Sequence, residues 1–282
     1  MNLAQIKVDE PGPSYVLGHS ERELERLTAQ ARLIDPITRR FFQAAGIAPG
    51  MRVLDVGSGA GDTAFLSAEL VGAGGEVLGI DRSAVAVRAA TARAKDKSCC
   101  NVTFIEGDPT ETDFEDPFDA ITGRYILLFQ SDPTTMLRKL IKHLRPGRIV
   151  VFHEPEPHFG HSFPPVISYD KCIRLFRETM SRSGANIHMG LKLFSVFVSA
   201  GLPPPTMRME AVIAGGSNGS EHVRLLTDIV RTVLPEMERL GVATEIGVEI
   251  DTLAERIYAE MTAKESVIVA RGEIGAWSKV DA

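Results

Sequence analysis

Three glycines at alternate positions follow a short apolar run. Of all segments in the sequence, this one gives the strongest indication of ligand binding. The run is Val53–Val56, and the loop after it contains Gly57, Ser58, Gly59 and Gly61. Glycine permits a tight turn and lets the backbone approach a ligand where a side chain would collide. A helix is expected to begin just after Gly61, so that its first amide groups face the same ligand. The segment therefore predicts a loop that binds a cofactor.

The charges around this loop indicate which ligand it accepts. Asp55 stands just before the glycines, where a carboxylate would repel a pyrophosphate but would suit an ammonium or sulfonium group. Asp62 occupies the place where the dinucleotide fingerprint G-x-G-x-x-G has its third glycine. These two residues favour a cationic cofactor over a nicotinamide dinucleotide, although glycine-rich turns of this kind serve both.

Acidic residues after the next two apolar runs fit the rest of an adenosine. Asp81 lies 20 residues after Gly61, where a carboxylate can accept hydrogen bonds from both ribose hydroxyls or can cap the next helix. Arg82 follows it and belongs to the same predicted set. Asp108 is placed to accept a hydrogen bond from an adenine amino group, with Gly107 and Pro109 on either side of it.

Candidates for acid–base chemistry follow the fourth and fifth apolar runs. Arg124 is expected either to bind a ligand carboxylate or to remain a solvated loop arginine. His153 and Glu154 end the fifth run and are the first candidates for a general base, because histidine titrates near neutral pH. Three later histidines are weaker candidates, since each would equally be a surface residue: His158, His161 and His188.

Alternating strands and helices are expected to hold these residues at one edge of a sheet. The apolar runs are Val53–Val56, Val77–Ile80, Val102–Ile105, Phe118–Ile121 and Ile149–Phe152. Helical stretches such as Ala84–Ala94 and Pro133–Leu144 lie between them. This order predicts an α/β fold with a parallel sheet and helices on both faces, whose ligands gather at the carboxyl ends of the strands. Two separate helices are expected before it, one opening at Ser20 and one from Pro36 to Ala45.

The alternation stops near residue 155, where residues 155–167 contain four prolines. Amphipathic helical faces follow, and we expect residues 156–200 and 218–262 to form a helical cap over the substrate. Residues 1–45 are predicted to form an arm and helices that close over the cofactor, and residues 46–155 the core. Residues 201–217 and 263–282 are predicted to supply the last strands of its sheet.

Taken as a set, these motifs resemble the class I S-adenosylmethionine (SAM)-dependent methyltransferases, and most of all the type found in ubiquinone and menaquinone biosynthesis. The resemblance covers residues 14–155 and includes Asp55–Gly61, Asp81, Gly107-Asp108, Phe118-Asp119 and Leu144–Gly147. It implies a Rossmann-like, seven-stranded, mostly parallel sheet whose last strand is antiparallel. It also implies that Met207–Ala214 and Ser266–Ala270 are the final two strands.

The resemblance further assigns roles within the cofactor site. It implies that Asp81 holds the ribose, that Asp108 holds the adenine and that the glycine loop holds the methionine part. Tyr15 and Gln30 stand where similar sequences close over the cofactor, although they would equally suit a surface arm and an exposed helix face.

Composition excludes several other classes of protein. The net charge is −6 without a dense Lys/Arg run, which argues against a nucleic-acid partner. No apolar stretch is long enough to span a membrane, and the first residues lack a secretory pattern. The three cysteines have no metal-like spacing, so we predict a cytoplasmic protein without a metal site. A homo-oligomer through the cap helices stays open.

The sequence thus predicts methyl transfer from SAM, with S-adenosylhomocysteine as coproduct, to an O, N or C atom of a small, apolar biosynthetic metabolite. Three alternatives remain. One is a non-catalytic SAM-binding module, although the long predicted cap favours an enclosed substrate site. A cyclase or isomerase of the same fold would bind SAM without using its methyl group, and an NAD(P)-dependent oxidoreductase would use the glycine loop differently.

Overall fold

The computed structural model describes residues 21–216 and 219–280, so the predicted arm and Tyr15 lie outside the described residues. The strands are β1 (Arg52–Val56), β2 (Glu76–Asp81), β3 (Val102–Glu106), β4 (Phe118–Arg124), β5 (Leu144–Glu156), β6 (His161–Phe163), β7 (Thr206–Glu210), β8 (Ile213–Gly215), β9 (Val267–Val269) and β10 (Gly272–Lys279). The helices are α1 (Glu21–Ala45), α2 (Asp62–Val71), α3 (Ala84–Asp96), α4 (Pro133–Leu140), α5 (Ile167–Arg182), α6 (Met189–Ser199), α7 (Gly219–Arg239), α8 (Glu245–Val248) and α9 (Leu253–Ala263). Three short 3₁₀ turns are η1 (Leu127–Phe129), η2 (Ile141–His143) and η3 (Pro157–Phe159).

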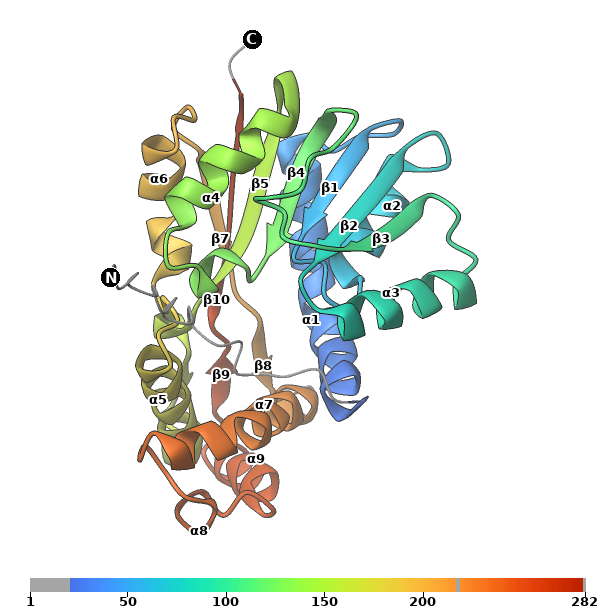
Figure 1. Ribbon diagram of the computed structural model, residues 1–282. Coiled ribbons are helices and arrows are strands. Elements are labelled where there is room, and N and C mark those ends of the chain that lie inside the picture. Colours follow the sequence, from blue (N-terminus) through green and yellow to red (C-terminus); the bar gives the residue numbers. More distant parts are fainter. Residues whose placement is uncertain (1–20, 217–218, 281–282) are drawn as a thin grey trace, which may run out of the picture.

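Seven strands form one twisted sheet in the order β3-β2-β1-β4-β5-β10-β7 (Figure 1). The first five strands in this order are parallel, and β10 runs antiparallel to both β5 and β7. All five predicted core strands are present, and the predicted mostly parallel sheet with an antiparallel last strand is confirmed. The switch in strand order lies between β1 and β4, which is where ligands of such sheets bind.

Alternating side chains of the central strands build a core on each face of this sheet. Leu54 and Val150 point toward α4 and α6, whereas Val53 and Val151 point toward α1 and α2. This alternation follows from the period of two along a strand. The central strands are therefore apolar on both sides, which explains the continuous apolar runs that predicted them.

Of the final two strands implied by the resemblance, one lies in the core sheet and the other does not. Thr206–Glu210 does join the sheet as β7, but the chain then leaves it, and β8 pairs with β9 in a second, three-stranded sheet of order β6-β9-β8. Ser266–Ala270 therefore supplies β9 of this second sheet and not a core strand. The true last core strand is β10, which begins at Gly272 and has Glu273, Gly275 and Lys279 breaking its apolar pattern.

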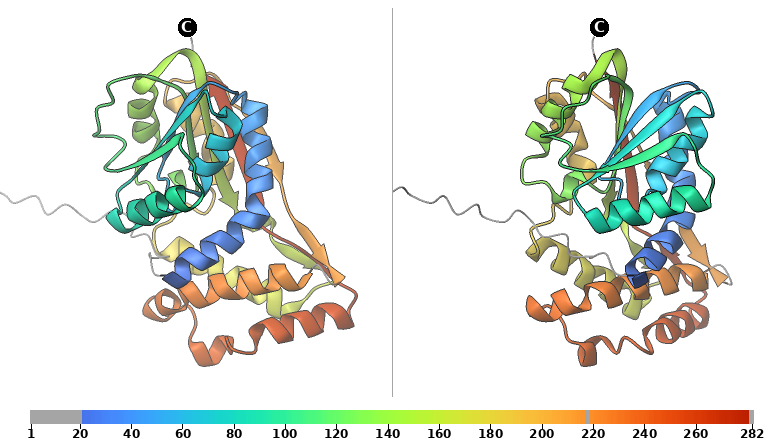
Figure 2. Two further views of the ribbon diagram at one scale, coloured as in Figure 1. Left: turned by 90° about the vertical axis from the view of Figure 1, so that its right-hand side faces the viewer. Right: turned by 45° about the vertical axis from the view of Figure 1, so that its right-hand side comes forward.

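The two helices predicted before the core form one helix instead. α1 runs from Glu21 to Ala45 with Pro36 inside it, and it bends along its length (Figure 2). A proline inside a helix removes one backbone hydrogen bond and bends the helix without necessarily ending it. The bend lets one part of α1 pack on β5 and β10 while another part contacts α7.

The helices below the sheet have a core of their own. Buried apolar side chains of α5, α7 and α9 pack together with Ala214 and Ile268 of the second sheet. Figure 1 shows this layer beneath the carboxyl ends of the core strands. Among the described helices, none is both long and apolar enough to cross a membrane.

Candidate active site

The glycine loop has the backbone geometry that only glycine adopts without strain. Gly57, Gly59 and Gly61 have φ values of +64°, +52° and +92°. A Cβ on Gly57 would lie 2.1 Å from Cδ1 of Ile126, whereas a Cβ on Gly59 would meet no atom within 4 Å. The loop therefore packs tightly at Gly57 and leaves free space beside Gly59, and α2 begins at the next residue after Gly61.

Asp81 anchors this loop from the end of β2. Its Oδ2 accepts a hydrogen bond of 2.8 Å from the Gly59 amide, and its Oδ1 accepts one of 2.8 Å from the Ser83 amide. Ser83 in turn caps α3 by accepting from the Ala86 amide. The carboxylate thus lies against the loop at the predicted ribose position, and each of its oxygens has a second lone pair for a ligand.

Asp55 is buried with half of its carboxyl group unsatisfied. It is 1% exposed, and Oδ1 accepts a 3.0 Å hydrogen bond from the Thr122 hydroxyl. Oδ2 has no hydrogen-bond partner among residues 21–216 and 219–280. Burial raises the pKa of Asp55 to about 7, because the surrounding protein disfavours the charged form. A cationic group beside Oδ2 would supply the missing partner, so these residues fit the cationic amino acid part of SAM.

The predicted adenine residues form a small polar cluster after β3. Asp108 accepts hydrogen bonds from the Thr110 amide and hydroxyl, at 2.8 and 2.9 Å, and its Oδ2 lies 2.6 Å from Arg82. Burial opposes this charge, but the bonds from Thr110 and Arg82 hold the pKa of Asp108 below its usual range. Pro109 is buried beside it, and Gly107 lies against Thr112.

Arg124 joins the end of β4 to helix α1. Its Nη1 donates to Asp35 Oδ1 at 2.7 Å and to Thr38 Oγ1 at 3.0 Å. Its side chain is only 9% exposed, so it is not a solvated loop arginine, and its described polar contacts are with α1. Gln30 also lies on α1, but its side chain is outside the described part of the chain.

His153 occupies a fully buried position with both ring nitrogens engaged. Nδ1 lies 3.1 Å from Thr38 Oγ1, and Nε2 lies 2.9 Å from Glu273 Oε2. Burial lowers the pKa of His153, so the ring is neutral at pH 7. Because an ionised carboxylate only accepts, the network assigns the proton to Nε2 and leaves Nδ1 to accept from Thr38.

Two further side chains complete the surroundings of Glu273. The Tyr125 hydroxyl donates to Oε2 at 2.7 Å, and Arg271 Nε donates to Oε1 at 2.9 Å. Burial opposes the charge of Glu273, but Arg271 and His153 outweigh it and lower the pKa of this carboxyl. Glu273 is therefore ionised, although it is 1% exposed.

Glu154 faces the other side of the sheet from His153. Its carboxyl group accepts hydrogen bonds from the amides of Ile126, Leu127 and Leu128, at 2.9, 2.7 and 3.4 Å. Burial raises the pKa of Glu154 to about 8. These bonds fix the start of η1, next to the glycine loop, and give Glu154 a structural task in addition to its predicted catalytic one.

An apolar pocket lies between α1, α5 and α7, and two charged side chains are among the residues that line it. Its apolar wall includes Leu33, Ile34, Tyr169, Ile173, Phe176 and Ile229, and Arg271 and Glu273 line the same pocket. The pocket thus connects through Glu273 to His153. Four residues of this network were not assigned a role from the sequence: Arg271, Glu273, Thr38 and Tyr125. For Arg271 and Glu273, the available signal was a pair of charges flanking Gly272 at the start of a buried strand.

The remaining histidines separate into two groups. His158 and His188 meet at Glu156, with their rings stacked 4.0 Å apart. His161 is exposed and lies near the Phe159 carbonyl instead. Thus the structure brings together two of the three later histidines that the sequence singled out.

The strand order and the glycine loop, with acidic residues near the carboxyl ends of β1, β2 and β3, together define a SAM-dependent methyltransferase. A family model described as a methyltransferase domain matches residues 47–184. A 2-phytyl-1,4-naphthoquinone methyltransferase of Synechococcus elongatus is 30% identical over 194 residues, which cover 67% of this chain and 80% of the relative. On this likeness the chain belongs to the SAM-dependent methyltransferase family.

Two other proteins extend this likeness. A demethylmenaquinone methyltransferase of Lactococcus lactis is 28% identical over 195 residues, covering 68% of this chain and 75% of the relative. The structure of a Haemonchus contortus phosphoethanolamine N-methyltransferase in complex with SAM shares the fold, with a TM-score of 0.52 and 18% identity over 86% of this chain and 51% of that one. The protein is an enzyme that transfers methyl groups to small molecules, and SAM is its cofactor.

Proposed function

We propose that this enzyme methylates an apolar small molecule at a hydroxyl or enol oxygen, or at the carbon next to it. The observation that carries the proposal is the pocket whose lining is mostly apolar but includes the charged side chains of Arg271 and Glu273. An apolar body gains free energy by burial in such a pocket, and a few fixed polar groups orient it. An acceptor with one polar end would therefore place that end at the two charged side chains.

The charged end of the pocket suits an acceptor that loses a proton. An ionised carboxylate has about four lone-pair positions, and His153, Tyr125 and Arg271 occupy three of those of Glu273. We infer that the fourth, on Oε1, accepts the hydrogen bond of the substrate hydroxyl. Arg271 lies beside it and would stabilise the negative charge that develops on the oxygen.

Residues of the glycine loop would hold the cofactor next to this end. SAM supplies an electrophilic methyl group on a sulfonium centre. We propose that Asp55, Asp81 and Asp108 bind its ammonium, ribose and adenine in that order, with Arg82, Gly107 and Pro109 around the base. Ile126, which contacts Gly57, is adjacent to Tyr125, so a single turn after β4 links the cofactor loop to Glu273.

The names of the relatives support an apolar acceptor with ring oxygens. One is named for a phytyl naphthoquinone and the other for demethylmenaquinone. We propose the same broad class, a reduced quinone or phenol with an apolar side chain, for this chain. We also propose a cytoplasmic enzyme without a nucleic-acid partner, in keeping with its charge of −6. Exposed apolar residues on α6, which falls in the predicted cap range but packs on the core sheet, support a homo-oligomer through this helix: Leu191, Phe194 and Val198.

Mass spectrometry with deuterated methyl SAM tests the proposal directly. Purified protein would be incubated with reduced naphthoquinones and phenols that carry short or long apolar chains. We expect a product that carries one labelled methyl group, formed together with an equal amount of S-adenosylhomocysteine. A product of unchanged mass would indicate the cyclase or isomerase alternative. Labelling confined to acceptors without an apolar part would contradict the proposed use of the pocket.

A further inference from the structure

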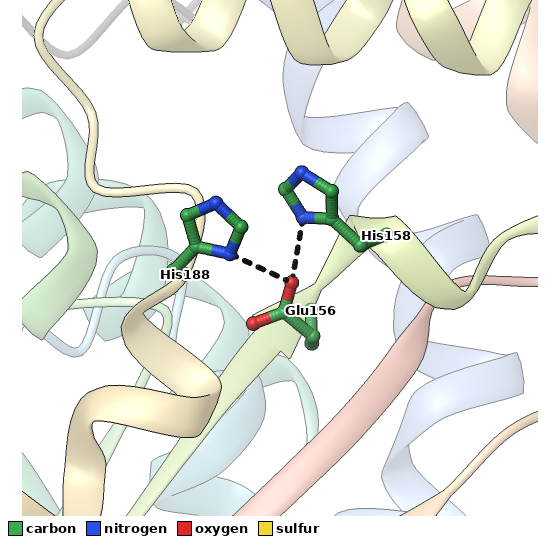
Figure 3. A group of neighbouring side chains, drawn as sticks. All are labelled: Glu156, His158 and His188. Atoms are coloured by element: carbon green, nitrogen blue, oxygen red, sulfur yellow. Dashed lines mark hydrogen bonds and ion pairs between the residues drawn. The ribbon is translucent and has the colours of Figure 1, made fainter.

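Two histidines and a buried glutamate converge outside the methyl-transfer network. Glu156 ends β5 and is 0% exposed, His158 lies in η3, and His188 is the N-cap residue of α6. His158 Nδ1 lies 2.8 Å and His188 Nδ1 lies 3.5 Å from the same oxygen, Glu156 Oε1. Figure 3 shows both rings turning these nitrogens toward the carboxylate.

From this geometry we propose that Glu156, His158 and His188 bind one divalent transition-metal ion. The three ligand atoms all lie within 4.8 Å of one another. Bonds of about 2.1 Å from one ion would hold such atoms a little over 3 Å apart. Small side-chain rotations are therefore enough to bring all three atoms onto a shared ion.

The burial of Glu156 supports a cation at this place. A carboxylate without solvent needs a nearby positive charge and hydrogen bonds for both of its oxygens. The ion pairs of Glu156 within the described residues are with the two histidines. Its Oε2 has no hydrogen-bond partner among the described residues. A divalent ion would supply the missing charge to this buried group.

The stacking of the two histidines places both rings on the same side of the site. The rings are 4.0 Å apart and inclined by 14°, and the Nδ1 atom of each ring lies near the same Glu156 oxygen. Imidazole nitrogen is among the commonest metal ligands in proteins. A single ion among the two rings and the carboxylate would therefore contact all three groups.

The ligand types indicate which ions fit. Two imidazoles and one carboxylate suit Zn²⁺, Fe²⁺, Co²⁺ or Ni²⁺, whereas Mg²⁺ and Ca²⁺ prefer oxygen ligands throughout. The side chains of His158 and His188 are 27% and 49% exposed, which gives an ion a path from solvent. Three protein ligands also leave at least one coordination position open.

The site borders the proposed substrate pocket. Pro157, which stands between two of the three ligands, lines that pocket. α6 packs closely here, since a Cβ on Gly190 would lie 3.3 Å from Glu156 Cβ. An ion would thus join the end of β5, η3 and the start of α6 into one rigid wall of the pocket. This metal site does not depend on the identity of the methyl acceptor.

Metal titration of the untagged, chelator-treated chain tests the proposal. We expect one equivalent of Zn²⁺ to bind and to raise the melting temperature, because an ion that binds only the folded chain stabilises it. Co²⁺ should give a visible absorption spectrum without a near-ultraviolet thiolate band, since no cysteine is a ligand. Failure of both ions to bind, or a thiolate band, would overturn the proposal.

Variants separate this site from adventitious binding. His188→Gln changes a half-exposed side chain and should weaken Zn²⁺ binding at least about tenfold, and Glu156→Gln should do the same. His161→Gln is the matched control, an exposed histidine nearby that touches neither ring. Equal Zn²⁺ affinity in His188→Gln and the wild type would overturn the proposal, as would equal weakening in the control. Melting temperatures in chelator show that each variant is folded.

Discussion

His153 and Glu273 lie on the same face of two antiparallel strands, with Nε2 of the histidine 2.9 Å from Oε2 of the glutamate. The register pairs His153 with Gly275 and Glu273 with Pro155. Gly275 has no side chain there, and a Cβ would lie 2.5 Å from the ring of Phe41. The absence of that side chain lets α1 press onto the sheet and bring Thr38 to the other ring nitrogen of His153.

This relationship predicts a defect in turnover without a matching defect in cofactor binding. Glu273→Gln keeps the shape of the side chain but removes its charge, so it can no longer accept a proton from the acceptor. We expect kcat to fall by about 100-fold or more, the usual contribution of a positioned base. Calorimetry should show nearly unchanged affinity for S-adenosylhomocysteine.

Glu210→Gln is the matched control for this variant. Glu210 stands opposite Glu273 on the neighbouring strand β7, but it pairs with Arg40 near the surface. Its turnover should stay close to the wild-type value. Wild-type turnover in Glu273→Gln would show that the charge of Glu273 is not needed for catalysis. Positioning of the acceptor would then account for the rate acceleration.

Asp55 predicts an unusual dependence of stability on pH. Its pKa rises from 3.8 to about 7 on folding, so the folded chain keeps a proton that the unfolded chain loses. The stabilising contribution is complete below pH 3.8 and is lost as the pH rises through 7, an effect of roughly 4 kcal/mol. Asp55→Asn should therefore be more stable than the wild type by roughly 4 kcal/mol at pH 8, and by only about 1.6 kcal/mol at pH 5.

Urea unfolding at the two pH values measures this effect. Asp119→Asn should behave in the opposite way. The Arg52 amide, Arg145 and Arg148 outweigh the burial of Asp119 and lower the pKa of that carboxyl, so the charged form stabilises the fold. We also expect Asp55→Asn to bind S-adenosylhomocysteine more weakly. An Asp55→Asn chain that is less stable than the wild type at pH 8 would contradict the assigned protonation.

Local patterns in the sequence were enough to predict the core of the fold. The central strands β1, β4 and β5 are largely buried on both faces, so their segments are mainly apolar, and the glycine loop follows the first of them. The last core strand was not recognised, because Gly272 and Gly275 interrupt it and its outer partner β7 is half exposed. Pairing between β10 and distant strands, rather than local propensity, determines its structure.

The buried polar network shows a similar limit. His153 was singled out from its type and its place at a strand end, but its partners Thr38 and Glu273 are 115 and 120 residues away. Thr38 lies on α1 two residues after Pro36, in the part of the helix that contacts β5. Likewise, Glu156, His158 and His188 have no recognisable ligand spacing, since the fold and not the chain brings His188 to the other two.

The glycine loop gives a prediction that separates stability from binding. Alanine at Gly57 or Gly59 adopts a positive φ at a cost of about 1–2 kcal/mol. Gly57→Ala also places its Cβ against Ile126, so it should lose a further 1–3 kcal/mol, roughly the cost of overpacking. The Cβ of Gly59→Ala points into free space, which we assign to SAM.

The two variants should therefore fail in different assays. Gly59→Ala should lose only about 1–2 kcal/mol of unfolding free energy, which is the cost of the positive φ. It should nevertheless bind S-adenosylhomocysteine at least about tenfold more weakly, a loss of about 1.4 kcal/mol of binding free energy. Gly57→Ala should show the larger loss of stability, and adding Ile126→Val should recover part of it. Full affinity in Gly59→Ala would place the cofactor elsewhere.

Glu154 gives the test of the second predicted catalytic residue. Its pKa of about 8 means that the carboxyl is mostly neutral at pH 7, and it holds three backbone amides at the start of η1. Glu154→Gln keeps an accepting oxygen, so we expect turnover near the wild-type value at pH 7. Glu154→Ala leaves the amides unsatisfied and should cost at least about 2 kcal/mol of unfolding free energy. Turnover rates and urea midpoints of both variants distinguish a structural from a catalytic role. A folded but inactive Glu154→Gln would mean that this carboxyl itself acts in catalysis.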